Sequence, residues 1–217
     1  ADGVIHQIGI LLTKTDDNGN VSYIEYLPNG ASPKYNSSSY AGIEYRNIQW
    51  NNNGDEHTFD ISYDVDSDYV LTFEYTDLSQ NDASIKANDG IQTNRSYTSK
   101  IVTVDKSAPV VNVSYSNNNV KNIIDGRAYY DDTQSATITV YEHNFRADDI
   151  KAVVSAVNVV GDNVFVDDYA AYLSNRNNWV KEGNTYTAHI TYSTDANYTF
   201  DIEYTDLARN VSGYYQT

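Results

Sequence analysis

The sequence has no cysteine, no methionine and only three prolines among its 217 residues. Without cysteine there are no disulfides and no thiol chemistry, which suits a secreted bacterial protein as well as a cytosolic one. Basic residues are also scarce, because 14 Lys and Arg stand against 30 Asp and Glu and the formal net charge is −16. A protein with this negative net charge repels nucleic acid and anionic membrane surfaces, so neither is expected as a partner.

Long apolar runs are missing too. No run reaches the roughly 18 residues that a membrane-spanning segment needs, and no secretory signal is recognisable. The abrupt start at Ala1 leads us to expect a fragment of a longer protein. Tyrosine is abundant instead, with 21 copies, and together with Thr, Val and Asn it favours strands and turns over helices.

The stretch Glu-Tyr-Thr-Asp-Leu occurs twice, at residues 74–78 and 203–207. Shifting the chain by 129 positions aligns residues 50–81 with 179–210 without a gap, and 13 of those 32 positions are identical. The shared positions include Trp50 with Trp179 and Tyr69 with Tyr198. An internal repeat of this length predicts two copies of one module.

Alternation of apolar and polar residues predicts antiparallel strands. The clearest are 57–64, with Phe59, Ile61 and Tyr63 on one face, and 69–76, with their counterparts at 186–192 and 198–204. Further strands are expected at 4–13, 21–27, 43–50, 97–105, 110–115, 136–141 and 150–160. Asn18-Gly19 predicts a hairpin turn, and 79–96 and 167–178 are expected to be loops.

About seven short strands per module, with turns every 8 to 12 residues, favour an all-β fold of two tandem Ig-like antiparallel β-sandwich modules. We place them at 1–105 and 106–217, with the boundary at residues 106–109, where Pro109 ends the strand pattern. The first module lacks a counterpart of strand 110–115, and the second lacks one of 97–105. Tyr69 and Tyr198 are expected to hydrogen-bond to upstream backbone in a tyrosine corner.

Three motifs resemble the Ig-like repeats of very large cell-surface proteins of gut Firmicutes. They are VTVDKSAPVV (102–111), YYDDTQSATITVYEHNF (129–145) and YTFDIEYTDLARN (198–210). The last contains a version of the family's Asp-x-Ala-Gly-Asn turn in which Arg209 replaces the usual Gly, and residues 77–81 depart further. The resemblance implies that the modules are stalks or adhesive modules, and that the protein is attached to the bacterial surface or secreted. Some related proteins bind host immunoglobulins.

Catalysis finds no support in the sequence, since there is no cysteine and no nucleophile elbow, and the four histidines lack metal-ligand spacing. We therefore predict that the protein is not an enzyme and has no cofactor. Trp50 and Trp179 could stack on sugars, but their equivalent positions favour a core role. Asp64, Asp66 and Asp68 alternate as Ca²⁺ ligands can, although only Asp66 recurs in the second copy and a role in shaping the corner is favoured.

The two copies differ most in residues 28–50. This segment holds Tyr35, Tyr40, Tyr45 and Arg46 among Ser, Gly and Asn, a composition typical of protein-binding loops. A solvated surface loop is the competing interpretation. We predict an extracellular, non-enzymatic binding module that engages a host protein through these residues, with immunoglobulin as the first partner to test. A passive stalk repeat and a Ca²⁺-dependent glycan-binding module are the alternatives.

Overall fold

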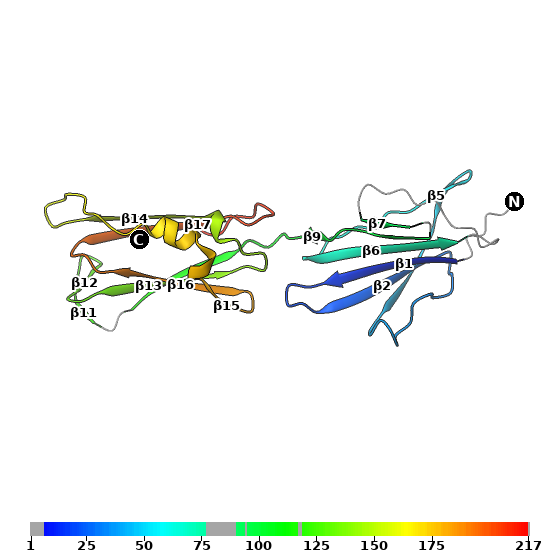
Figure 1. Ribbon diagram of the computed structural model, residues 1–217, viewed down its shortest axis with the longest axis horizontal. Coiled ribbons are helices and arrows are strands. Elements are labelled where there is room, and N and C mark those ends of the chain that lie inside the picture. Colours follow the sequence, from blue (N-terminus) through cyan, green and yellow to red (C-terminus); the bar gives the residue numbers. More distant parts are fainter. Residues whose placement is uncertain (1–6, 77–89, 94, 117–118, 217) are drawn as a thin grey trace. The chain divides into compact units, whose positions relative to one another are not determined.

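The protein folds into mostly β-structure in a computed structural model that describes residues 7–76, 90–93, 95–116 and 119–216 (Figure 1). The chain divides into two compact units, residues 1–105 (unit 1) and 106–217 (unit 2). Among the described residues, no helix is both long and apolar enough to cross a membrane. Each unit is described by itself.

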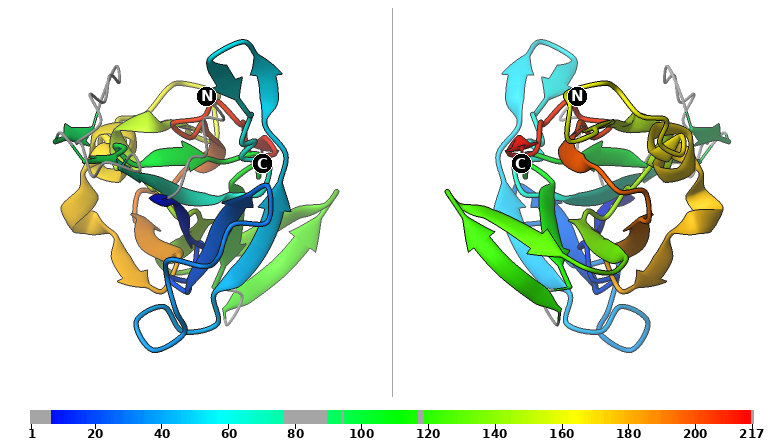
Figure 2. Two further views of the ribbon diagram at one scale, coloured as in Figure 1. Left: turned by 90° about the vertical axis from the view of Figure 1, so that its right-hand side faces the viewer. Right: turned by 90° about the vertical axis from the view of Figure 1, so that its left-hand side faces the viewer.

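Unit 2 is a β-sandwich of two antiparallel sheets. The first sheet has the order β10-β13-β16-β15 and the second the order β14-β17-β18. A separate hairpin of two strands projects from them (light green in Figure 2). The strands are β10 (Val110–Tyr115), β11 (Val120–Ile124), β12 (Arg127–Tyr130), β13 (Gln134–Tyr141), β14 (Ile150–Val157), β15 (Val180–Glu182), β16 (Thr185–Tyr192), β17 (Asn197–Tyr204) and β18 (Tyr215–Gln216).

The core of unit 2 follows from strict alternation in the sequence. In β13, Ala136, Ile138 and Val140 are fully buried, while the residues between them face outward. β16 and β17 alternate in the same way and bury their aromatic and aliphatic side chains. Period-two patterning of this kind buries one face of each sheet against the other.

Unit 1 is built around one larger sheet. Its order is β3-β2-β1-β6-β8-β7, and β9 also pairs with β6. The β2–β3 pairing is parallel, which differs from the wholly antiparallel arrangement expected from the sequence. The strands are β1 (Gln7–Thr15), β2 (Val21–Pro28), β3 (Glu44–Ile48), β4 (Asn51–Asn53), β5 (Glu56–Thr58), β6 (Ser67–Thr76), β7 (Ile91–Gln92), β8 (Ser96–Thr98) and β9 (Val102–Val104).

The strand expected at 57–64 does not form as a whole. β5 ends at Thr58, and residues 59–64 belong to no strand, although Phe59, Ile61 and Tyr63 turn inward as the alternation predicts. A strand needs a neighbour for its backbone hydrogen bonds, and no described residue supplies one here.

Three further elements were not expected from the sequence. The segment 167–178 contains helix α1 (Tyr169–Ser174) and a 3₁₀ turn, η2 (Arg176–Asn178). Another 3₁₀ turn, η1 (Ala147–Asp149), lies earlier in the chain, before β14. α1 is too short to show helical periodicity, and it begins where the Asp168 carboxylate accepts a hydrogen bond from Ala171 N at 2.9 Å. The expected loop at 79–96 lies largely outside the described residues.

The repeated corner is present in both units. Tyr69 Oη donates to Val65 O at 2.6 Å, and Tyr198 Oη donates to Thr194 O at 2.9 Å. These bonds confirm the expectation that each tyrosine ties the start of its strand to the residue four positions upstream. The turn at 206–210 is also formed, because Asn210 N donates to Asp206 Oδ1 at 2.8 Å. Its counterpart at 77–81 lies outside the described residues.

Candidate functional site

The segment between β2 and β3, residues 29–43, is called the tyrosine loop below. It stands out from the sheet of unit 1 (blue in Figure 2). Of the four residues predicted to contact a partner, Tyr35 and Tyr40 are half-buried within the loop, and Tyr45 and Arg46 are exposed on β3. β3 is the edge strand of the sheet, and four of its five residues are exposed.

A buried carboxylate fixes the start of the loop. Glu25 on β2 is only 1% exposed, and its two carboxylate oxygens accept hydrogen bonds from Lys34 N at 2.7 Å and Tyr35 N at 3.1 Å. Lys34 Nζ also lies 2.5 Å from a carboxylate oxygen of Glu74 on β6. Hydrogen bonds to a charged acceptor are stronger than neutral ones, so Glu25 ties the backbone at Lys34 and Tyr35 to β2.

Three tyrosine rings support the loop from within. The ring of Tyr40 packs edge-on against Tyr23, with centroids 5.1 Å apart, and against Tyr35, with centroids 5.3 Å apart. Tyr35 sits directly over Gly9, where a Cβ atom would come within 2.8 Å of its hydroxyl. Burial raises the pKa of Tyr35 far above its ordinary value, and the nearby Glu74 carboxylate adds to this effect. Tyr35 and Tyr40 therefore serve as supports.

Tyr45 and Arg46 are both exposed, but as consecutive residues of β3 their side chains point to opposite faces of the strand. Tyr45 Oη donates to Tyr35 O at 3.0 Å, which fixes the ring, and 42% of the residue stays exposed. Arg46 makes a two-pronged pair with Glu44, with Nε–Oε1 2.8 Å and Nη2–Oε2 3.1 Å, and these hydrogen bonds lower the pKa of Glu44. Tyr and Arg are among the residue types most enriched at interface hot spots, so each of the two exposed side chains is a candidate contact on its own face of β3.

The corresponding segment of unit 2 is built differently. Tyr169 is buried, and its hydroxyl donates to Thr191 O on β16. Tyr172, on the same helix, is 40% exposed. The segment also exposes Val159, Val160 and Phe165 between β14 and α1. This part of unit 2 therefore closes the sandwich with a helix, where unit 1 has the tyrosine loop.

Both tryptophans belong to the interior. Trp179 is 4% exposed, its Nε1 donates to Leu173 O at 2.7 Å, and it meets Phe145 edge-on with centroids 5.0 Å apart. Trp50 is half-buried and meets Phe59 edge-on with centroids 4.9 Å apart. A sugar-stacking platform needs an open ring face, and these contacts favour the core role.

The alternating carboxylates Asp64, Asp66 and Asp68 do not come together as a cluster of metal ligands within the described parts of the chain. Asp68 Oδ1 accepts a hydrogen bond from Thr103 Oγ1 at 2.5 Å, which ties β6 to β9. The structure thus places these residues along the corner that Tyr69 closes.

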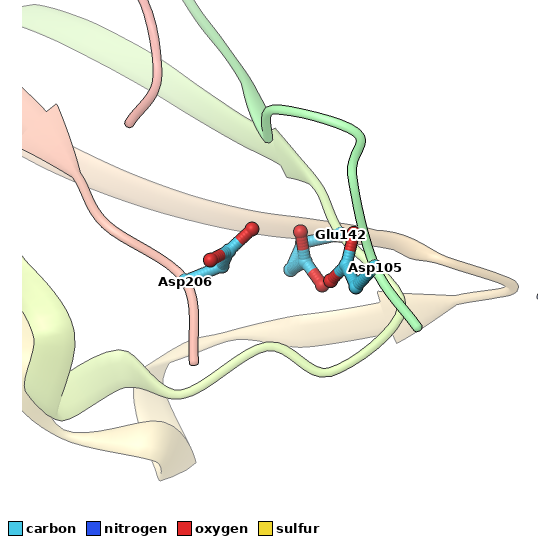
Figure 3. A group of neighbouring side chains, drawn as sticks. All are labelled: Asp105, Glu142 and Asp206. Atoms are coloured by element: carbon cyan, nitrogen blue, oxygen red, sulfur yellow. The ribbon is translucent and has the colours of Figure 1, made fainter. Parts of the chain in front are cut away.

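A different cluster of three carboxylates was not predicted from the sequence. Glu142 and Asp206 of unit 2, together with Asp105, the residue directly before that unit, bring carboxylate oxygens within 4.8 Å of one another (Figure 3). Glu142 and Asp206 are buried and already shape turns, since Glu142 Oε1 accepts from Asn144 N at 2.8 Å and Asp206 Oδ2 accepts from Asn210 Nδ2 at 2.9 Å. Those bonds give the two carboxylates a structural role.

Comparison with known proteins identifies no relative: no family model, no curated protein and no solved structure matches the chain.

Proposed function

We propose that the protein is a non-enzymatic binding module of the bacterial cell surface, or secreted, that engages a host protein through the tyrosine loop and β3. The buried Glu25 carboxylate that holds this loop carries the proposal. A connection that only joins two strands needs no buried charge, whereas a binding surface benefits from a backbone fixed before the partner arrives.

The fold supports a surface module. The sheet orders of unit 2, β10-β13-β16-β15 and β14-β17-β18, match the ABED and CFG orders of Ig-like sandwiches and so support the proposal of an Ig-like module. The repeat of residues 50–81 at 179–210 supports the proposal that unit 1 is a second Ig-like module, one that diverges around the tyrosine loop. Tandem modules of this kind serve as stalks and adhesive arms in the surface proteins that the sequence resembles.

An immunoglobulin is the first partner to test, because the resemblance includes proteins that bind one. The experiment is capture from serum by the immobilised 217-residue chain, followed by Tyr45→Ala and Arg46→Ala. We expect each substitution to weaken capture by about 10-fold or more, as at an interface hot spot. Tyr141→Ala is the matched control, because Tyr141 is a similarly exposed strand tyrosine in unit 2.

Other outcomes would point elsewhere. Capture that survives both substitutions would move the contact away from the tyrosine loop. Binding to a glycan array that requires Ca²⁺, with no serum protein retained, would favour the glycan-binding alternative. No ligand in either screen would favour a passive stalk repeat.

A further inference from the structure

The segment between β14 and α1 of unit 2, residues 158–168, carries the three most exposed large apolar side chains of the described residues. Val159 is 91% exposed, Val160 76% and Phe165 86%. The segment projects past the end of β14 (Figure 1), and its two adjacent valines are called the apolar tip below. Single exposed apolar residues are common on protein surfaces, but several in one projecting segment are typical of a contact surface.

A hydrogen-bonded turn holds the apolar tip in place. Asn158 N donates to Asp162 O at 2.9 Å, and Gly161 N donates to Asn158 O at 3.0 Å. The Asn158 side chain closes the turn from within, because its Oδ1 accepts from Val160 N at 3.0 Å and from Asp162 N at 2.9 Å. A backbone that is fixed before a partner arrives loses less conformational entropy on binding.

The base of the segment is tied to β14. Val164 N donates to Ala156 O at 3.0 Å, and the next pair in this register sets Phe165 level with Ser155. Ala156 is buried and Ser155 is exposed, so Phe165 lies on the outward face of the strand. The same face exposes 63% of Val153. Apolar side chains therefore stand both at the tip and along the adjoining face of β14.

The charges of the segment have one sign. Asp162, Asp167 and Asp168 are exposed, and residues 152–175 include no Lys or Arg. From outside, Arg127 approaches the base of the segment, where its Nη1 is 3.5 Å from Asn197 Oδ1 on β17. The three carboxylates leave the segment with an excess of negative charge. A second copy of this acidic chain, or a membrane of anionic lipids, would meet like charge here.

We propose that the apolar tip and Phe165 form a second contact surface, which enters an apolar pocket of a partner protein whose rim carries Lys or Arg. A projecting turn fits a concave partner, and valine side chains have little rotamer freedom to lose on burial. The aspartates would face the basic rim, which speeds association and orients the complex. This surface shares no residue with the tyrosine loop, and the inference goes beyond the proposed function.

The test uses human serum separated on a cation exchanger at neutral pH, so that the retained fraction holds the basic proteins. The immobilised 217-residue chain should capture a protein from this fraction, which is identified by mass spectrometry and then titrated in purified form. Val159→Ser combined with Val160→Ser should weaken its affinity by about tenfold or more. Val180→Ser is the matched control, because Val180 is a valine of β15, in the same unit, that is 71% exposed.

Salt tests the charge of the partner. Asp162→Asn should weaken binding about twofold to fivefold at low ionic strength, as the loss of one exposed charge pair does. The difference from the unmodified chain should disappear near 1 M salt, where exposed charges are screened. An affinity of the unmodified chain that does not fall with salt would overturn the basic rim and with it the proposal.

Further outcomes separate this surface from other occupants and from the tyrosine loop. Tyr45→Ala should leave the captured protein bound. A loss with Tyr45→Ala but not with the double valine variant would support the proposed function and overturn this inference. Equal affinities of the double variant and the Val180→Ser control, or no captured protein, would also overturn it. The same holds for tip-dependent binding to phosphatidylcholine vesicles and for tip-dependent dimers in sedimentation, because the occupant would then be a lipid surface or a second copy.

Discussion

Units 1 and 2 carry the same repeat, yet they close their cores differently. In unit 2 the interior ring of Trp179 meets Phe145, a residue that follows β13. In unit 1 the equivalent Trp50 meets Phe59 in a similar edge-on contact, and Phe59 occupies the position of Ala188. In unit 1 the ring that packs against the tryptophan therefore comes from Phe59, within the repeat itself. In unit 2 it comes from Phe145, which lies outside the repeat.

This difference teaches that the repeat encodes the corner and the inward face, while the neighbouring strands decide how far that face is buried. Tyr192 is 8% exposed in unit 2, where β13 pairs with its strand, but its counterpart Tyr63 stays half-buried. The same side-chain pattern therefore yields unequal stabilisation, since burial and not pattern removes apolar area from water.

The largest expected effect is a difference between the two tryptophans. Trp179→Ala should destabilise unit 2 by about 3–5 kcal/mol, because it leaves a cavity in a closed core. Trp50→Ala should cost unit 1 only about 1–2 kcal/mol, since a half-buried side chain loses less burial. Hydrogen exchange resolved by unit measures both. Equal losses would contradict the idea that unit 1 is the more open core.

The next largest effect should be a loss of the folding stability of unit 2 at alkaline pH. Burial raises the pKa of Tyr204 to about 12, and Tyr192 and Tyr169 are shifted upward for the same reason. Below pH 10 folded and unfolded chains both hold these protons, so the contribution is fully present. Between about pH 10 and 12 the unfolded chain loses its protons first, and stability falls.

The measurement is the midpoint of urea unfolding of unit 2 between pH 8 and 12. Tyr204→Phe should lower stability at pH 8, because Tyr204 Oη accepts a hydrogen bond from Arg146 N at 3.0 Å. The variant should, however, lose less on going to pH 12. An identical slope in both proteins would exclude Tyr204 as a source of the alkaline loss.

The sequence predicted the elements whose signal is local. The alternation in β6, β13, β16 and β17 and the two tyrosine corners were recognisable because side-chain period and turn chemistry lie within a few residues. Pairing between distant segments was not recognisable. The parallel β2–β3 contact, the failure of 59–64 to form a strand and the helix α1 all depend on neighbours that a sequence window does not contain.

In the candidate site, too, the sequence predicted the local feature and missed the contacts between distant residues. Composition identified the segment that contains Tyr45 and Arg46, which the structure exposes. It could not separate these from Tyr35 and Tyr40, because one residue type serves both as a contact and as a support. Glu25 was missed altogether, since a single Glu in a strand carries no signal until the fold places Lys34 N and Tyr35 N against it.

A smaller effect is expected at that carboxylate. Glu25→Ala should destabilise unit 1 by about 1–3 kcal/mol, because the amides of Lys34 and Tyr35 lose a charged acceptor. Partner binding should fall as well, since the tyrosine loop would become mobile. Glu56→Ala is the control, because Glu56 is an exposed glutamate of unit 1 that lies on β5, outside the tyrosine loop and β3. Calorimetry and the serum capture assay measure the two losses, and an unaffected capture would separate the loop from binding.

The smallest effect tests what the units share. Tyr69→Phe and Tyr198→Phe each remove one hydroxyl that both donates to and accepts from backbone four residues upstream. Each should cost its own unit about 1 kcal/mol, the net value of such hydrogen bonds. The two losses should be similar although the cores differ, because the corner geometry is the same. A loss confined to unit 2, read by exchange in each unit, would show that the corner depends on the closed core around it.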